Sequence, residues 1–133
     1  MSDVRFSYTI VYVPDVRRAL EFYSSAFGFE QGFVSPDGDY GELQTGSTTL
    51  SFASEALGAS HFEHGFLRHS LANPPFGTEL AFATADVAAA VTRALDAGAQ
   101  LLVPAETKPW GQTVAWVRNP HGVLIEICTP IGS

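Results

Sequence analysis

The sequence predicts an α+β fold built from two tandem modules, each of which runs strand, helix and then two or three antiparallel strands. Two observations carry this prediction. The stretches 8–30 and 79–101 share one pattern, in which an apolar strand is followed by an aspartate and then by residues of helical period. The offset that carries Asp15 onto Asp86 also carries Tyr8 onto Glu79, as expected for a tandem repeat.

The first repeat predicts a strand before Asp15 and a helix that ends at Gly28. A short carboxylate at Asp15 can accept backbone N–H bonds of the first helical turn, and glycine ends helices because the left-handed conformation costs it little. Apolar residues recur between the two at the spacing of one helix face: Val16, Ala19, Leu20, Tyr23 and Phe27.

The second repeat predicts the same arrangement, with Asp86 as the N-cap and Gly98 as the stop. Its apolar face is again spaced for a helix: Val87, Ala90, Val91, Ala94 and Leu95.

Paired strands are expected to close each module, because 39–54 resembles 109–129 as strand, turn and strand. In the second of these stretches the turn NPHG, residues 119–122, combines a proline that fixes φ with a glycine that supplies a positive φ. This pattern predicts a β-hairpin.

An acid interrupts the apolar final strand GVLIEICTP. Period-2 alternation places Leu124, Glu126 and Cys128 on one face of that strand and Val123, Ile125 and Ile127 on the other. A buried carboxylate must find a cation, hydrogen-bond donors or a proton. Glu126 is therefore the first candidate site residue.

The predicted organisation is a single domain over 1–133, with module one at about 5–55, a connector at about 56–76 and module two at about 77–131. The stretch from 54 to 78 contains glycines and two prolines and has no sustained period, so we interpret it as a long connection or lid. His61, His64 and His69 lie within it, and whether they are solvated loop residues or ligands stays open.

Composition excludes several classes of function. The chain of 133 residues carries seven basic and fourteen acidic side chains, a formal charge of −7 that disfavours nucleic acid and anionic membranes as partners. No apolar run is long enough to span a bilayer, and the start MSDVRFSYTI lacks a signal-peptide pattern, which predicts a cytoplasmic location. Cys128 is the single cysteine, so an internal disulfide and a cysteine-built zinc site are excluded.

Three stretches resemble the vicinal oxygen chelate superfamily, which contains glyoxalase I, extradiol dioxygenases and the fosfomycin and bleomycin resistance proteins. These stretches are VPDVRRALEFYSSAFGF, ELAFATADVAAAVTRALDAGA and KPWGQTVAWVRNPHGVLIEICTP. The resemblance covers nearly the whole chain. It implies a glyoxalase/bleomycin-resistance-like fold, in which two βαβββ modules form a curled mixed sheet around a cavity, and it implies a homodimer.

The resemblance also implies a set of site residues. Metal-dependent members hold a divalent ion with side chains of the first and last strands of each module, positions that correspond here to Tyr8, Ser51, Glu79 and Glu126. Glu126 matches the glutamate of those members, whereas Tyr8 and Glu79 stand where histidine is common and Ser51 is a poor ligand. If they converge, Tyr8, Glu79 and Glu126 are the candidates for acid–base chemistry, since like charges in one pocket raise a carboxyl pKa.

Two functions follow as expectations. The first is a binding protein, closest to the metal-free bleomycin-resistance-like members, that holds a small amphipathic or cationic molecule in its cavity. The second is a metal-dependent glyoxalase-like lyase or isomerase, or a dioxygenase, that uses Glu79 and Glu126 around Mg, Mn, Ni, Zn or Fe. An enzyme without a metal fits the same residues. Candidate ligand-binding residues are Trp110, Gln112, Trp116, Ser51, Tyr40 and Phe52.

Overall fold

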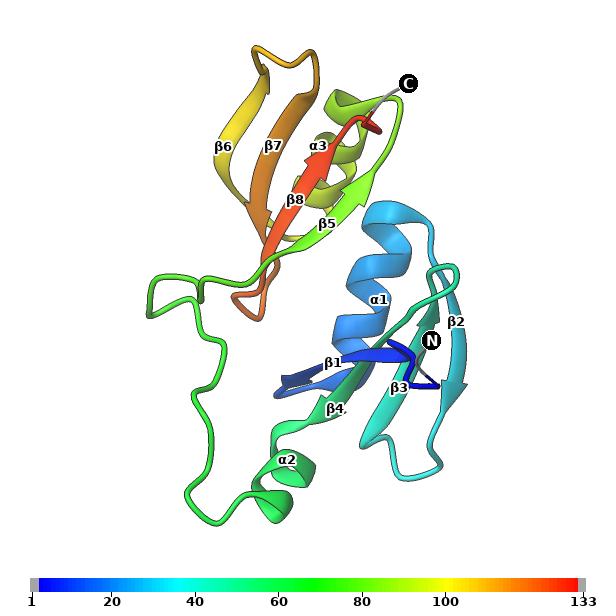
Figure 1. The fold of residues 1–133 in the computed structure, drawn as a ribbon. Helices are drawn as coiled ribbons and strands as arrows, with labels where there is room; N and C mark the ends of the chain where they lie inside the picture. The colour runs from blue at the N-terminus through cyan, green and yellow to red at the C-terminus, as the bar shows by residue number, and fades with distance from the viewer. Residues whose placement is uncertain (1–2, 132–133) are drawn as a thin grey trace. The chain divides into compact units, whose positions relative to one another are not determined.

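The computed structural model describes residues 3–131 and confirms the α+β fold of two tandem modules. The chain forms two compact units. The first contains the chain up to Ser24 and Gly28–Arg68, and the second contains Ser25–Phe27 and the chain from His69 onward. Each unit holds a four-stranded mixed sheet (Figure 1). In the described part of the chain, no helix has the length and apolar character needed to cross a membrane.

The first sheet has the strand order β1-β4-β3-β2. Its parallel pair is β1 and β4, and the other neighbours are antiparallel. The strands are β1 Tyr8–Val13, β2 Glu30–Val34, β3 Tyr40–Gln44 and β4 Thr49–Ser54, and the helix α1 Val16–Phe27 follows β1.

Helix α1 begins and ends where the sequence predicts. Asp15 Oδ1 accepts a hydrogen bond of 3.1 Å from the backbone N–H of Arg18, and Gly28 ends the helix with φ +75°. The helix lies directly on β3, because a Cβ added at Gly41 would be 2.7 Å from Leu20 Cδ1. Any larger residue at position 41 would have to displace the Leu20 side chain.

The second sheet repeats this topology with the order β5-β8-β7-β6. Asp86 caps its helix by accepting a 3.0 Å hydrogen bond from the N–H of Ala89. That helix ends one residue earlier than predicted, with Ala97 as the cap and Gly98 following at φ +107°. The elements are β5 Leu80–Ala83, α3 Val87–Asp96, β6 Gln100–Thr107, β7 Thr113–Arg118 and β8 Leu124–Cys128.

The predicted hairpin between β7 and β8 is confirmed. Asn119 N–H donates to Val123 O at 3.1 Å, and Gly122 supplies the positive φ of +93°. The Asn119 side chain completes the turn by accepting hydrogen bonds of 2.9 Å from the N–H groups of His121 and Val123.

The connector begins with a short helix that its lack of a sustained period did not indicate, α2 Glu55–His61. Ser54 caps this helix by accepting a 3.0 Å hydrogen bond from the N–H of Leu57. A helix of seven residues is too short to show a sustained period. It is held by packing, since a Cβ at Gly58 would lie 2.8 Å from Tyr12 and 2.9 Å from Phe66.

Each sheet has one face against its helix and a second face, here called the distal face, turned away from that helix. The buried face of β8 carries Ile125 and Ile127, both fully buried, whereas Glu126 is partly exposed on the distal face as alternation predicts. The registers place Tyr8, Ile10, Tyr40, Glu42 and Ser51 on the first distal face, and Trp116, Arg118, Leu124, Glu126 and Cys128 on the second.

Candidate functional site

Two carboxylates and an indole meet on the second distal face. Trp116 on β7 lies directly across from Glu126 on β8. The Trp116 Nε1–H donates a hydrogen bond of 2.8 Å to Oε2 of Glu79, the residue that precedes β5. Two strands and the residue that leads into a third therefore bring these side chains to the same place.

Glu126 has an altered acidity in this cluster. Burial is the largest cause that raises the pKa of Glu126, and its hydrogen bond with Glu79 raises that pKa further. The raised pKa means that Glu126 holds its proton to a higher pH than an exposed glutamate does. A cation bound beside it would favour the ionised form.

Cys128 lies beside this pair and is almost completely buried. Burial raises the pKa of the Cys128 thiol, and the adjacent Glu126 adds to the rise. The thiol is the nucleophile only when it is ionised. Cys128 is therefore kept in its unreactive form, as expected for a buried structural cysteine.

The ring of Trp116 already holds an ammonium group. Lys108 Nζ lies 5.6 Å from the centroid of the indole, within the range of a cation–π interaction. The same Nζ is 3.8 Å from Oε2 of Glu106, which is largely exposed. Sequence reasoning missed Lys108, because nothing in the pattern around it indicates that its side chain reaches Trp116.

Trp110 and Gln112 lie at the edge of the same distal face. Trp110 Nε1–H donates to Gln112 Oε1 at 2.8 Å, and Gln112 Nε2–H donates to the backbone oxygen of Thr129 at 2.8 Å. The indole itself is 68% exposed. The amide of Gln112 thus holds an exposed aromatic ring in one orientation.

The remaining predicted residues belong to the first unit. Tyr40 on β3 donates from its hydroxyl to Glu42 Oε2 at 2.7 Å. Burial is the main cause that raises the pKa of Tyr40, the Ser51 hydroxyl partly offsets it, and Glu42 adds to the rise. Ser51 is fully buried and donates to the backbone oxygen of Thr9 at 3.3 Å.

Glu42 is a candidate site residue that sequence reasoning missed. It pairs with Ser51 across β3 and β4. Alternation along the strand YGELQ places Tyr40 and Glu42 on one face, and this pattern in the sequence could have identified Glu42. Tyr8 is exposed on β1 of the same unit, and its convergence with Glu79 and Glu126 stays a prediction.

Phe52 does not reach the distal face, which corrects its assignment as a ligand-binding residue. Its ring is fully buried and stacks on Tyr23 of α1 with the centroids 5.0 Å apart. The reason is the period of a strand, because neighbours such as Ser51 and Phe52 point to opposite faces.

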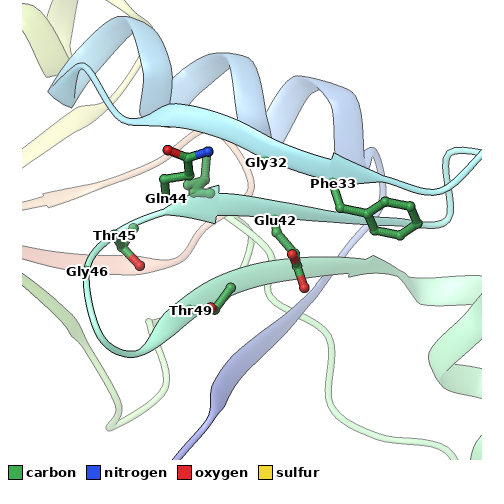
Figure 2. A pocket seen from close by; sticks show the side chains of 8 residues that line it. Gly32, Phe33, Glu42, Gln44, Thr45, Gly46 and Thr49 are labelled. Atoms are coloured by element: carbon green, nitrogen blue, oxygen red, sulfur yellow. The ribbon is translucent and has the colours of Figure 1, made fainter.

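A hollow of about 530 Å³ lies over β2, β3 and β4 of the first unit (Figure 2). Figure 2 shows the Glu42 side chain between Phe33 at one end and Gln44 with Thr45 at the other. The lining residues are Gly32, Phe33, Glu42, Leu43, Gln44, Thr45, Gly46 and Thr49.

The described residues do not supply a metal-binding set of the expected kind. Among residues 3–131, no group of three or more histidine, cysteine, aspartate or glutamate side chains is placed to hold an ion. Glu79 and Glu126 are the pair that such a site would use, but catalytic metal sites commonly need about three protein ligands. Within the second unit, Glu79 and Glu126 thus supply fewer ligands than a catalytic metal site commonly uses.

Arg118 lies on the same strand face as Trp116, but its side chain binds backbone oxygens of the connector and of the β7–β8 turn. Its guanidinium is almost completely buried and donates to three backbone oxygens of the second unit. The partners are Asn73 O at 2.8 Å from Nη1, Ser70 O at 2.9 Å from Nη2, and Gly122 O at 3.1 Å from Nε and 2.9 Å from Nη2. The connector is thereby held at the end of the second distal face.

The histidines of the connector do not form one site. His61 ends α2 and is exposed, as is His64, whereas His69 is partly buried with its ring 4.8 Å from that of Phe76. Their role stays open.

A model of a known protein family matches most of the chain. A model described as the Glyoxalase/Bleomycin resistance protein/Dioxygenase superfamily matches residues 5–127. Among curated proteins, none matches the sequence.

Solved structures share the fold over nearly the whole chain. A glyoxalase-related enzyme from Fulvimarina pelagi is 23% identical with a TM-score of 0.82, covering 97% of this chain and 93% of its own. A glyoxalase/bleomycin resistance protein/dioxygenase family enzyme from Burkholderia phytofirmans is 21% identical with a TM-score of 0.75, covering 95% and 98%. TioX from a Micromonospora species is 20% identical with a TM-score of 0.69, also covering 95% and 98%.

Proposed function

Because the chain belongs to the glyoxalase/bleomycin resistance protein/dioxygenase superfamily, we propose that it binds a small amphipathic or cationic molecule on its second distal face without a resident metal. The observation that carries the proposal is the meeting of Glu126, Glu79 and Trp116. Two neighbouring acids offer negative charge to a cation, and the adjacent indole offers a face for stacking.

Lys108 supports the choice of a cation. The position of its ammonium group over the Trp116 ring indicates that this ring, with two carboxylates near it, accepts positive charge. Trp110 adds a second, exposed aromatic surface whose orientation is held by Gln112. An amphipathic cation would place its charge at the carboxylates and its apolar part on the indoles.

The proposal is tested by calorimetric titration with benzyltrimethylammonium, an aromatic quaternary ammonium ion, and with neutral benzyl alcohol as its comparison. We expect saturable binding of the cation and much weaker binding of the alcohol. Titration in two buffers of different ionisation enthalpy should show that the cation displaces a proton from the Glu79–Glu126 pair.

Variants locate the binding site. We expect Glu126→Gln and Trp116→Phe each to weaken binding of the cation, while Asp96→Asn, which changes an exposed acid at the end of α3, serves as the matched control. Equal affinity for the cation in wild type and Glu126→Gln, or no proton release, would contradict the proposal.

The second candidate function is a metal-dependent lyase, isomerase or dioxygenase that uses Glu79 and Glu126. The observation in its favour is that these two carboxyl groups are close enough to share a hydrogen bond. Elemental analysis after loading with manganese or nickel distinguishes the two functions. A stoichiometric ion that is lost on Glu126→Gln would favour the enzyme and would count against the metal-free binding protein.

We also propose that the chain is a homodimer. Strand β6 is at the edge of its sheet and is exposed along its whole length, and Leu101 and Leu102 are each 43% exposed there. Exposed apolar edges are disfavoured in monomers. Light scattering after size exclusion should give about twice the chain mass of 14.3 kDa. The mass of a single chain across the micromolar range would contradict the dimer.

A further inference from the structure

We propose that Arg118 is a positioning residue for the cation site of the second unit, because its hold on the connector sets where the Glu79 carboxylate stands beside Trp116. The consequence for ligand binding rests on the function proposed above. The contacts that carry the inference do not involve a ligand, and all of them lie in the second unit, which contains the chain from His69 onward.

The guanidinium of Arg118 binds the backbone rather than facing a ligand. It belongs to a residue that is only 6% exposed, and it donates hydrogen bonds of 2.8–3.1 Å to the carbonyl oxygens of Ser70, Asn73 and Gly122. Hydrogen bonds from a charged donor are stronger than neutral ones, and the planar fork of a guanidinium fixes the direction of each partner. Arg118 therefore holds the connector backbone at two points, Ser70 and Asn73.

The turn between β7 and β8 contacts the same stretch of the connector. A Cβ at Gly122 would lie 2.8 Å from the carbonyl carbon of Ser70 and 2.9 Å from its nitrogen, so the two backbones touch. Ser70 also begins a tight turn. Its carbonyl accepts the N–H of Asn73 at 3.2 Å, and its hydroxyl accepts the N–H of Ala72 at 3.1 Å. Residues 70–73 are thus held both by Arg118 and by the turn.

The segment from Asn73 to Glu79 is short and partly stiff. Five residues separate the two, and the pair Pro74-Pro75 has fixed φ angles that favour an extended backbone. The ring centroid of Phe76 lies 4.8 Å from that of His69, which ties the segment back to the start of the unit. We therefore expect a displacement at Asn73 to reach Glu79.

Glu79 depends on this segment because it lies just outside the sheet. The pairing of β5 with β8 begins at Leu80, opposite Ile125. The Glu79 carboxylate is bound instead by the indole N–H of Trp116, at 2.8 Å. Trp116 and Arg118 are two residues apart on β7 and share one face, so their Cα atoms lie about 7 Å apart. The segment therefore begins at one side chain of β7 and ends at the next on the same face.

The indole N–H of Trp116 reports directly on Glu79. A ¹H–¹⁵N correlation spectrum of the full chain should contain two indole signals, and Trp116→Phe identifies one of them by its loss. Glu79→Ala gives the position of the Trp116 signal without its acceptor. We expect Arg118→Met to move the Trp116 signal most of the way to that position. The signal of Trp110, whose acceptor is Gln112, should stay in place.

Ile127→Val is the matched control for a loss of stability. Ile127 is fully buried on the face of β8 opposite to Glu126, so the change destabilises the same unit and should leave the Trp116 signal in place. Arg118→Lys keeps the charge without the fork of donors, and its signal should lie between those of wild type and Arg118→Met. It also decides the matter if Arg118→Met does not fold. A wild-type signal in every Arg118 variant that folds, or an equal shift in Ile127→Val, would overturn the proposal.

Ligand binding gives a second readout. We expect Arg118→Met to weaken benzyltrimethylammonium binding about three- to tenfold, because the site keeps Glu126 and Trp116 but loses the carboxylate of Glu79. Removal of a positive charge would by itself strengthen the binding of a cation, so a weaker affinity cannot come from net charge. Ile127→Val should bind as wild type does.

The two readouts separate this inference from the function on which it rests. Wild-type affinity in Arg118→Met would contradict the role of Arg118 in binding. If the wild type itself does not bind the cation, the proposed function fails, whereas the Trp116 signal still decides whether Arg118 positions Glu79.

Discussion

The guanidinium of Arg118 and the backbone carbonyl of Ser70 are joined by a hydrogen bond of 2.9 Å that holds the connector to the end of β7. Glycine at 122 makes this contact possible, since a Cβ there would lie 2.8 Å from the carbonyl carbon of Ser70. The connector then runs on to Glu79, so Arg118 and Gly122 together set where the chain enters β5. A site acid is thus placed partly by a residue that does not touch it.

Replacing Arg118 by methionine should destabilise the second unit. The substitution keeps much of the apolar stem but leaves the carbonyls of Ser70, Asn73 and Gly122 without their donor, which we expect to cost about 2–4 kcal/mol. Urea unfolding measures the loss. Arg18→Met is the control, because the Arg18 side chain is 80% exposed and should change stability by less than about 0.5 kcal/mol. Similar small effects of both changes would contradict the anchoring role.

The stability of the protein should depend on pH through Glu126. Its pKa is raised in the folded protein above the ordinary value of 4.5, first by burial and then by Glu79. The folded state therefore holds the proton more tightly, and the resulting stabilisation is complete below pH 4.5 and is lost as the pH rises through the raised pKa.

Unfolding measured at successive pH values should show this loss in wild type and a smaller one in Glu126→Gln, which cannot ionise. Glu106→Gln, on the exposed β6 strand, should keep the wild-type profile. The account of the acid pair would be wrong if Glu126→Gln retained the full pH dependence.

Repeating local signals made much of the fold predictable from sequence. Asp15 and Asp86 mark helix starts through chemistry that acts within one turn, and the NPHG turn fixes a hairpin in the same local way. Alternation in β8 placed Glu126 correctly for the same reason. Helix α2 was missed because it packs against Tyr12 and Phe66. Tyr12 is distant in sequence, and Phe66 lies outside any periodic pattern.

The site was less predictable, because the sequence does not indicate which side chains contact each other across neighbouring strands. Phe52 was named as a ligand-binding candidate beside Ser51, although neighbours in a strand point to opposite faces and Phe52 is fully buried. Glu42 was missed although alternation with Tyr40 indicates its face. The contact of Lys108 with Trp116 depends on how β6 and β7 pair, and sequence spacing does not specify that geometry.

Removing the ammonium of Lys108 should strengthen cation binding on the second distal face. Lys108 lies over the Trp116 ring and would compete with a ligand cation for it. We expect Lys108→Met to bind benzyltrimethylammonium about two- to fivefold more tightly, the amount that one cation–π interaction supports. Arg18→Met controls for the change in net charge, because it removes a positive charge from the other unit. A gain of equal size in both variants would assign the effect to net charge alone.

Substitution of Gly58 by alanine tests whether α2 is held by tertiary packing. Alanine is favoured over glycine within a helix by about 1 kcal/mol, so propensity alone predicts a more stable protein. The added Cβ, however, would lie 2.8 Å from the Tyr12 ring and 2.9 Å from that of Phe66, and such overpacking costs about 1–3 kcal/mol. We therefore expect Gly58→Ala to lower the free energy of unfolding measured in urea.

Gly77→Ala is the control, because no atom lies within 4 Å of a Cβ there. A Gly58→Ala protein as stable as wild type would show that α2 is held by its own propensity rather than by Tyr12 and Phe66.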